Sequence, residues 1–151
     1  FVERTFDVLS GHPHDLLVSS FYEGALAAAR TVDPSVPVAT ILFDSIQDGL
    51  RIAHRYDGEA VHPPLNMIPG TKFSTAEYRG LGPFDELDEF DVIAVAREEG
   101  WEVNAWTIET WHEAAEARRA GADGIITDYP DVFRFDAAAG RPRGRVPSRD
   151  R

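Results

Sequence analysis

The sequence predicts an α/β fold built on a parallel sheet of five strands. Short apolar runs alternate with helical patterns along the chain, which is the arrangement that places strands side by side in a parallel sheet. Several runs end in polar or aromatic residues just before a helical pattern. The strands are expected at residues 16–19, 36–43, 59–62, 102–108 and 124–127.

The first third of the chain opens with a short helical pattern. Residues 2–6 read as the interior of a helix, and the first strand follows a turn-like segment at 11–15. The alanine-rich segment Glu23–Arg30 is helical. The β-branched residues of 36–43 then predict a buried strand.

A capping residue marks the start of the next helix. Asp44 or Ser45 can accept hydrogen bonds from its first turn, after which apolar residues recur at helical spacing. Residues 59–62 form a weaker strand that two prolines end. The segment 66–84 is punctuated by Pro and Gly and predicts a long loop, of the kind that is either functional or disordered.

The last third repeats the strand and helix alternation. A helix is expected at 90–99, with Gly100 as its stop, and further helices at 110–120 and 131–139. Residues 1–139 therefore read as one domain. The segment 140–151 places arginines among Gly, Pro and Ser, which predicts a disordered tail.

Five parallel strands fit two architectures, and one of them is a complete doubly wound sheet. That alternative lacks support from nucleotide-binding loops, since neither GxGxxG nor GxxxxGK[ST] occurs. The other architecture is an α/β barrel, in which functional groups lie at the carboxyl ends of the strands.

Composition narrows the function classes. The net charge is −11, and a surface this acidic repels nucleic acid and anionic membranes. One lysine against fourteen arginines fits either a halophilic source or a high-GC genome. The chain has no cysteine, which excludes disulfides and thiolate chemistry. No apolar run approaches the ~20 residues of a membrane span, and we expect a cytoplasmic protein.

Three segments carry a resemblance to a known family. Residues 16–21, 103–109 and 122–130 resemble, in order and spacing, motifs from the C-terminal part of the glycerophosphodiester phosphodiesterase family. The resemblance runs from Asp15 to about Phe133. It implies a (β/α)8 TIM barrel, of which this chain holds about the last five β/α units. Since Phe1 begins inside a helical pattern, we expect the chain to be cut at its N-terminus.

The resemblance also implies a chemistry. Members cleave a small-molecule glycerophosphodiester to an alcohol and glycerol 3-phosphate, using a divalent cation (Mg or Ca) and a general acid. The family supplies these groups mainly from His-Arg-Gly, Glu-x-Asp and His-Asp motifs in its N-terminal half. His54-Arg55-Tyr56 and His14-Asp15 imitate two of them in the wrong places, so no catalytic or metal-ligating residue is assigned and the chain alone is expected to be inactive.

With the catalytic and metal-ligating residues unassigned, the resemblance implies that the strand-end residues of this chain form one wall of the substrate pocket. Trp106 either presents a flat face to the glycerol or the leaving group, or packs in the core. His62 either meets phosphate or a cation, or is structural. Glu109 stands where the family usually has Asn; it either binds a cation or an amine, or serves the first turn of a helix. The predicted substrate-binding residues are Trp106, Phe21, Ser20 (a hydroxyl donor), His62 and Glu109.

A second hypothesis needs no catalysis. The half-barrel could bind a partner or a phosphorylated ligand without turnover. Open edges of the five-strand arc would also favour self-association.

Overall fold

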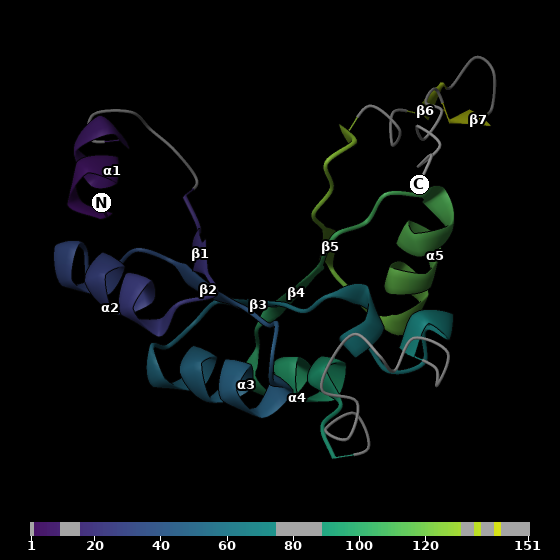
Figure 1. Cartoon of the computed structure of the whole chain (residues 1–151), viewed down its shortest axis with the longest axis horizontal. Helices are drawn as coiled ribbons and strands as arrows, with labels where there is room; N and C mark the ends of the chain where they lie inside the picture. The colour runs from purple at the N-terminus through teal and green to yellow at the C-terminus, as the bar shows by residue number, and fades with distance from the viewer. Residues whose placement is uncertain (1, 10–15, 75–88, 131–134, 137–140, 143–151) are drawn as a thin grey trace.

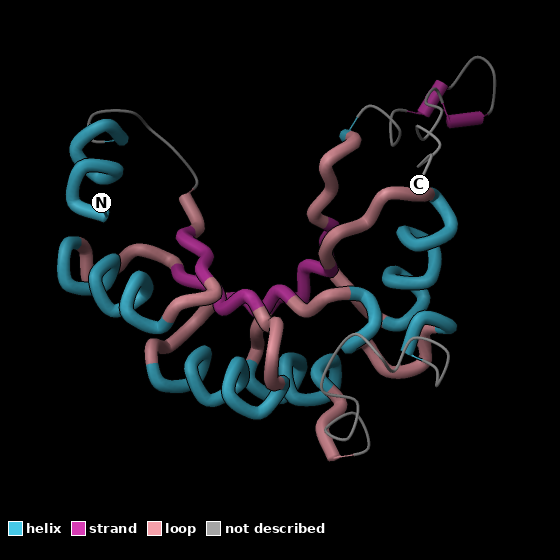
Figure 2. Tube along the Cα trace, viewed as in Figure 1, coloured by secondary structure: helices cyan, strands magenta, loops and turns pink. Residues whose placement is uncertain are grey.

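The computed structural model describes residues 2–9, 16–74, 89–130, 135–136 and 141–142. Its centre is a five-stranded parallel sheet in which every strand pairs with the next strand along the chain (Figures 1 and 2). The predicted α/β fold with a parallel sheet is therefore confirmed. In order, the strands are β1 (Val18–Ser20), β2 (Val38–Ile41), β3 (Ala60–His62), β4 (Glu102–Ala105) and β5 (Gly124–Ile125).

The sheet curves into an open arc, with the strands along its inner side and the helices around its outer side (Figure 1). We call the inner side the concave face and the helix-covered side the convex face. A short 3₁₀ turn, η1 (Leu65–Met67), and a second, η2 (Lys72–Ser74), lie between β3 and β4. The helices are α1 (Val2–Leu9), α2 (Glu23–Val32), α3 (Ile46–Arg55), α4 (Val92–Glu99) and α5 (Trp111–Ala120).

Local capping chemistry sets the helix boundaries. The Ser45 hydroxyl accepts a hydrogen bond from the Asp48 amide at the start of α3. Thr110 begins α5 with a capping box, in which its hydroxyl and the Glu113 carboxylate each accept backbone hydrogen bonds. Gly100 ends α4 at a φ of 77°, a left-handed conformation that glycine adopts without strain.

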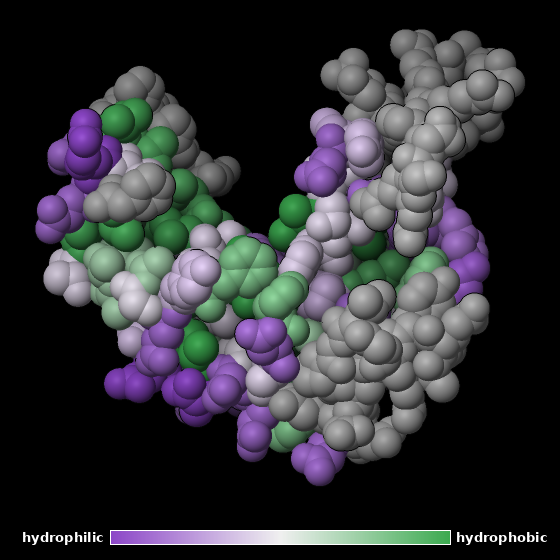
Figure 3. All heavy atoms as spheres, in the orientation of Figure 1, coloured by the Kyte–Doolittle hydropathy of each residue, from purple (hydrophilic) through white to green (hydrophobic). Residues whose placement is uncertain are grey.

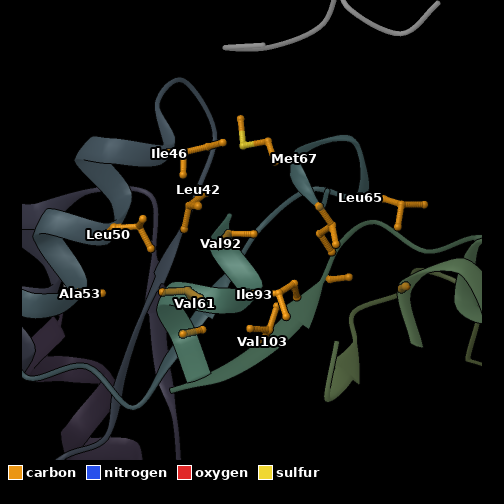
Figure 4. Close-up of a cluster of buried hydrophobic side chains, with 14 of the residues drawn as sticks. Leu42, Ile46, Leu50, Ala53, Val61, Leu65, Met67, Val92, Ile93 and Val103 are labelled. Atoms are coloured by element: carbon orange, nitrogen blue, oxygen red, sulfur yellow. The ribbon is translucent and has the colours of Figure 1, made fainter. Parts of the chain in front are cut away.

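The main hydrophobic core lies between the sheet and the helices on the convex face. Val61 of β3 and Val103 of β4 point into it, where Ile46 of α3 and Val92 of α4 meet them; all four side chains are fully or almost fully buried (Figure 4). A smaller cluster joins α2 to the first two strands around Leu26. Because strand side chains alternate between faces, the neighbours of Val61 and Val103 point to the concave face.

Several expected elements differ from the observed ones at their ends. The apolar runs 36–43 and 102–108 extend beyond the paired strands, since apolar residues continue into the loops that leave the sheet. The expected long loop contains the two 3₁₀ turns, and its residues 75–84 lie outside the described residues.

The predicted helix at 131–139 is wrong at Phe135 and Asp136. These two residues form β6 (Phe135–Asp136), which pairs in antiparallel fashion with β7 (Arg141–Pro142). The rest of that predicted helix and of the tail at 140–151 lies outside the described residues. Within the part of the chain that is described, no helix has the length and apolar character that a membrane crossing requires.

Candidate functional site

The strand register places one row of residues side by side on the concave face. Ile41 of β2 is opposite His62 of β3, and Asn104 of β4 is opposite Gly124 of β5. The β3–β4 pairing of Val61 with Val103 puts His62 beside Asn104. Parallel neighbours in register point to the same face, so the row crosses the arc near the carboxyl ends of its strands.

Above this row, at the carboxyl ends of the strands, three aromatic rings form a cluster. Phe21 follows β1, Phe43 follows β2 and Trp106 follows β4. The ring centroids of Phe21 and Trp106 are 5.5 Å apart, and those of Phe43 and Trp106 are 6.3 Å apart in a stacked arrangement. Phe21 and Phe43 meet edge to face at 5.9 Å. We call these three residues the aromatic cluster.

The aromatic cluster is open to solvent. Phe43 is 59% exposed and Phe21 is 47% exposed, although both follow buried or half-buried strands. A space-filling view shows the hollow between the two arms of the arc, with apolar residues along it (Figure 3). Exposed aromatic groups that gather at one place indicate a surface that a ligand or another part of a protein covers.

Trp106 is held in place by the strand beside it. Its indole Nε1–H donates to the backbone carbonyl of His62 at 2.7 Å. Its backbone amide donates to the carbonyl of Pro63, and its own carbonyl accepts from the Leu65 amide at 2.9 Å. The peptide bond between Trp106 and Thr107 is cis. These bonds fix the ring at the edge of the concave face, in contact with Phe21 and Phe43.

His62 lies in the row below the aromatic cluster and is only 4% exposed. The Asn104 side-chain amide lies 3.3 Å from its Nε2; the amide nitrogen donates, so Nε2 accepts. Burial lowers the pKa of His62 below its ordinary value of 6.5, which favours the neutral ring. Its Nδ1 is buried and makes no hydrogen bond within the described part of the chain.

Gly124 makes room for the Asn104 side chain. A Cβ atom at position 124 would collide with the side-chain oxygen of Asn104. The glycine therefore leaves room for the Asn104 side chain, whose amide nitrogen contacts His62. Nothing in the spacing of the sequence identified Asn104 as a partner of His62, because that contact depends on the register of two strands.

The structure brings together some of the sequence-predicted site residues and separates others. Phe21 and Trp106 join the aromatic cluster, and His62 lies beneath them. Ser20 is level with Thr40, and its hydroxyl accepts a hydrogen bond from the Tyr22 amide at 3.0 Å. Glu109 follows β4, half-buried, and its amide donates to the Glu113 carboxylate. The binding roles of these five residues remain predictions.

Sequence reasoning missed Phe43 as part of the site. It was assigned to the buried strand 36–43, whereas the sheet ends at Ile41 and leaves the Phe43 ring exposed beside Trp106. The sequence does contain a signal for this position: Phe43 stands directly after a β-branched segment and before a helix cap, where a strand is expected to end.

Among the described residues, the His, Asp and Glu side chains are dispersed. No group of three or more His, Asp or Glu side chains comes together anywhere in the described ranges. His62 is buried against an amide and not beside carboxylates. His54, from the rejected His-Arg look-alike, is exposed on α3, where its Nδ1 lies 3.6 Å from Glu99 Oε2. His14 and Asp15 lie outside the described residues.

The parallel arc, its outer helices and the side chains gathered at the carboxyl ends of its strands define an incomplete β/α barrel. The model of the glycerophosphoryl diester phosphodiesterase family matches residues 1–132. The chain therefore belongs to that family, and the resemblance noted in its sequence is confirmed.

Solved structures show the same fold. A phosphodiesterase from Oleispira antarctica, in complex with the product sn-glycerol-3-phosphate, has a TM-score of 0.61 and 21% identity. A putative glycerophosphodiester phosphodiesterase from Galdieria sulphuraria also has a TM-score of 0.61, with 16% identity. One from Silicibacter pomeroyi has a TM-score of 0.51 and 20% identity.

These matches cover most of this chain and less than half of each relative. The shares are 85% of this chain and 45% of the Oleispira protein, 85% and 47% for the Galdieria protein, and 76% and 34% for the Silicibacter protein. The chain thus spans less than half the length of the structures it matches. No curated protein matched the chain.

Proposed function

We propose that this chain forms one wall of the substrate site of a glycerophosphodiester phosphodiesterase. The substrate class is a glycerophosphodiester, which such an enzyme hydrolyses to an alcohol and glycerol 3-phosphate. The observation that carries the proposal is the aromatic cluster at the carboxyl ends of three barrel strands, in a chain that belongs to this family. Carboxyl ends are where barrel enzymes place their sites.

Each part of the wall has a physical role in the proposal. The flat face of Trp106 packs against the carbon atoms of the glycerol or of the leaving alcohol, and Phe21 and Phe43 border it. Removal of these apolar surfaces from water favours binding. Asn104 orients the neutral His62 ring beneath them. The ligand in the Oleispira structure, glycerol 3-phosphate, has the size and chemistry of the molecule we assign here.

The divalent cation and the general acid of the reaction are assigned to the family motifs that do not occur at the corresponding places in this chain. The described side chains supply no cluster that could hold such a cation. We therefore propose that the chain by itself binds glycerol 3-phosphate without hydrolysing its diesters. The proposal also includes a cytoplasmic location and, on the acidic and lysine-poor composition, an adaptation to high salt.

The test combines binding with turnover. Glycerol 3-phosphate is titrated calorimetrically into the chain, and release of glycerol 3-phosphate from glycerophosphocholine is followed with Mg²⁺ and with Ca²⁺. We expect saturable binding and no release. Trp106→Ala should weaken binding at least about tenfold, a loss of about 1.4 kcal/mol. Trp111→Ala, a tryptophan on α5, is the matched control.

Equal binding by the two variants would contradict the proposed wall. Efficient release by the unmodified chain would contradict the assignment of the catalytic groups to other residues.

A second function rests on the same open face. The exposed aromatic cluster and the edges of β1 and β5, which pair with no further described strand, also suit a half-barrel that binds a partner, including a second copy of itself. Sedimentation velocity distinguishes the two: a dimer that fails to bind glycerol 3-phosphate would favour this alternative.

A further inference from the structure

The two ends of the arc differ in what each of them lacks. At the first end, β1 pairs with β2 and with no other described strand, yet α1 continues the helix layer beyond α2 on that side (Figure 1). Val2 and Phe6 of α1 pack against the smaller core cluster around Leu26, which holds α1 beside α2. The first end therefore has a helix that extends past the last described strand.

The second end shows the opposite arrangement. β5 pairs with β4 and with no further described strand. Ile125 of β5 is opposite Ala105 of β4, which is completely buried in the main core, so Ile125 points to the convex face. Ile125 is nevertheless 37% exposed. The second end therefore has a strand whose convex side the described helices leave partly open.

Exposed apolar side chains gather at both ends of the arc. Val8 of α1 is 74% exposed, and Leu17, which comes just before β1, is also exposed. At the other end, Ile126 follows Ile125 and is exposed as well. Adjacent strand residues point to opposite faces, so these two isoleucines present apolar groups on both sides of the sheet. Apolar groups that gather on a surface indicate a contact with another molecule.

The direction of the strands makes the two ends compatible with each other. All five strands are parallel, so β1 and β5 run the same way. Rotation of a second copy about an axis along the strands brings its β5 beside β1 in the parallel sense, where α1 can cover it. A twofold rotation makes this contact twice and closes the assembly. Pairing of β1 with β1 of a second copy would be antiparallel and would leave both β5 edges open.

The helices that would meet in such an assembly differ in charge. α1 carries Glu3 and Asp7 against a single basic residue, Arg4. α5 ends in Arg118 and Arg119, both exposed, although a glutamate one turn earlier binds the second of them. An α1 helix that covers the outer side of β5 lies next to α5. The acidic helix and the basic helix end are therefore brought together, which favours this contact over one between two α1 helices.

We propose that two copies of this chain close into a ring, in which β5 of each copy pairs beside β1 of the other and lies under that copy's α1. The inference rests on the second function proposed above and names its partner. The carboxyl end of β5 in one copy lies beside Phe21 of the other, so residues of both copies border each aromatic cluster. Twice five strands exceed the ~8 whose interior is filled by side chains, so the ring encloses the hollow of Figure 3 as a cavity.

Sedimentation velocity of the unmodified chain is the first test. It is run in about 1 M NaCl, which screens the repulsion between two chains of net charge −11, and we expect a dimer. Val8→Lys places a charge in the contact near the arginines of α5 and should raise the dimer Kd at least about tenfold. Val32→Lys, the same change at an exposed valine of α2, is the matched control and should leave the Kd unchanged.

Both valines are exposed, so circular dichroism should show that each variant folds as the unmodified chain does. A monomer, an assembly larger than a dimer, or an equal Kd for the two variants would overturn the ring.

The absence of cysteine allows the arrangement of the copies to be tested directly. Chains that carry Val8→Cys are mixed with chains that carry Ile125→Cys and are treated with a bismaleimide. Linked dimers should form in the mixture and in neither variant alone, because the ring places position 8 of one copy near position 125 of the other. Linkage in the Val8→Cys sample alone would show that α1 meets α1 and would overturn the proposal.

Glycerol 3-phosphate titrated into the same samples keeps this inference distinct from the proposed substrate wall. Binding of glycerol 3-phosphate by a monomeric chain supports the wall and overturns the ring. A dimer that does not bind glycerol 3-phosphate supports the ring and contradicts the wall.

Discussion

The two faces of this sheet use the same strands for different purposes. On the convex face, Val61 and Val103 are buried beneath α3 and α4, and apolar side chains fill the space between them. On the concave face, the next residues along the same strands, His62 and Asn104, carry polar groups, and exposed aromatic rings lie above them. One face supplies stability, while the other exposes the aromatic rings to which we assign a binding role.

The largest expected effect tests whether stability comes mainly from the convex face. Ile108 is completely buried in the main core, whereas Phe43 is a larger side chain on the concave face and mostly exposed. Ile108→Ala should lower the free energy of unfolding by about 2–5 kcal/mol. Phe43→Ala should lower it by about 1 kcal/mol or less.

Urea denaturation of both variants measures the difference. Equal losses would break the comparison, because the aromatic cluster would then be a second core and not an open surface.

A smaller effect tests the row on the concave face. Gly124→Ala should lower the free energy of unfolding by about 1–3 kcal/mol, because the new Cβ collides with the Asn104 side chain. Gly24 of α2 has no atom within 4 Å of such a Cβ. Gly24→Ala should therefore stabilise the protein by about 0.5–1 kcal/mol through helix propensity.

Adding Asn104→Ala to Gly124→Ala should restore most of the lost stability, which thermal melts of the single and double variants would reveal. An unimproved double variant would show that the strain lies in the backbone of β5 and not in this contact.

The smallest effect concerns the buried histidine. Burial lowers the pKa of His62 in the folded state, so the unfolded chain binds the proton more readily. The stability contribution is complete above the ordinary value of 6.5 and is lost as the pH falls through that value towards the folded-state pKa. His62→Gln should flatten this dependence between about pH 8 and about pH 5.

His54→Gln, a change at an exposed histidine of α3, is the control for the pH series. Unfolding free energies from urea titrations would contradict the expectation if the His62 variant kept the slope of the unmodified chain.

The sequence was sufficient for the order of the elements because each depends on local signals. Caps at Ser45 and Thr110, the stop at Gly100 and the apolar runs all act within a few residues. The parallel pairing then follows from the alternation of strands and helices. The helix expected at 131–139 failed at Phe135 and Asp136, where pairing with Arg141 and Pro142 outweighs local helical pattern.

The site was only partly predictable. Trp106 and Phe21 were identified because each stands at the end of an apolar, strand-like segment that also resembles a family motif. The contact of His62 with Asn104 depends on register, and the exposure of Phe43 depends on where β2 leaves the sheet. Neither is fixed by spacing along the chain.

The order of strands in the sheet has a consequence for how the arc forms. Most strands pair with a neighbour one helix away along the chain, but β3 and β4 are separated by residues 63–101. Closing that longer segment costs more chain entropy than closing the others. We therefore expect the units before and after it to order first, and the hydrogen bond from the Glu102 amide to Glu59, 2.9 Å long, to form last. Pulse-labelled hydrogen exchange during refolding would then show late protection of the Glu102 amide. The pairing of β3 with β4, in the middle of the arc, would be the last step of sheet formation.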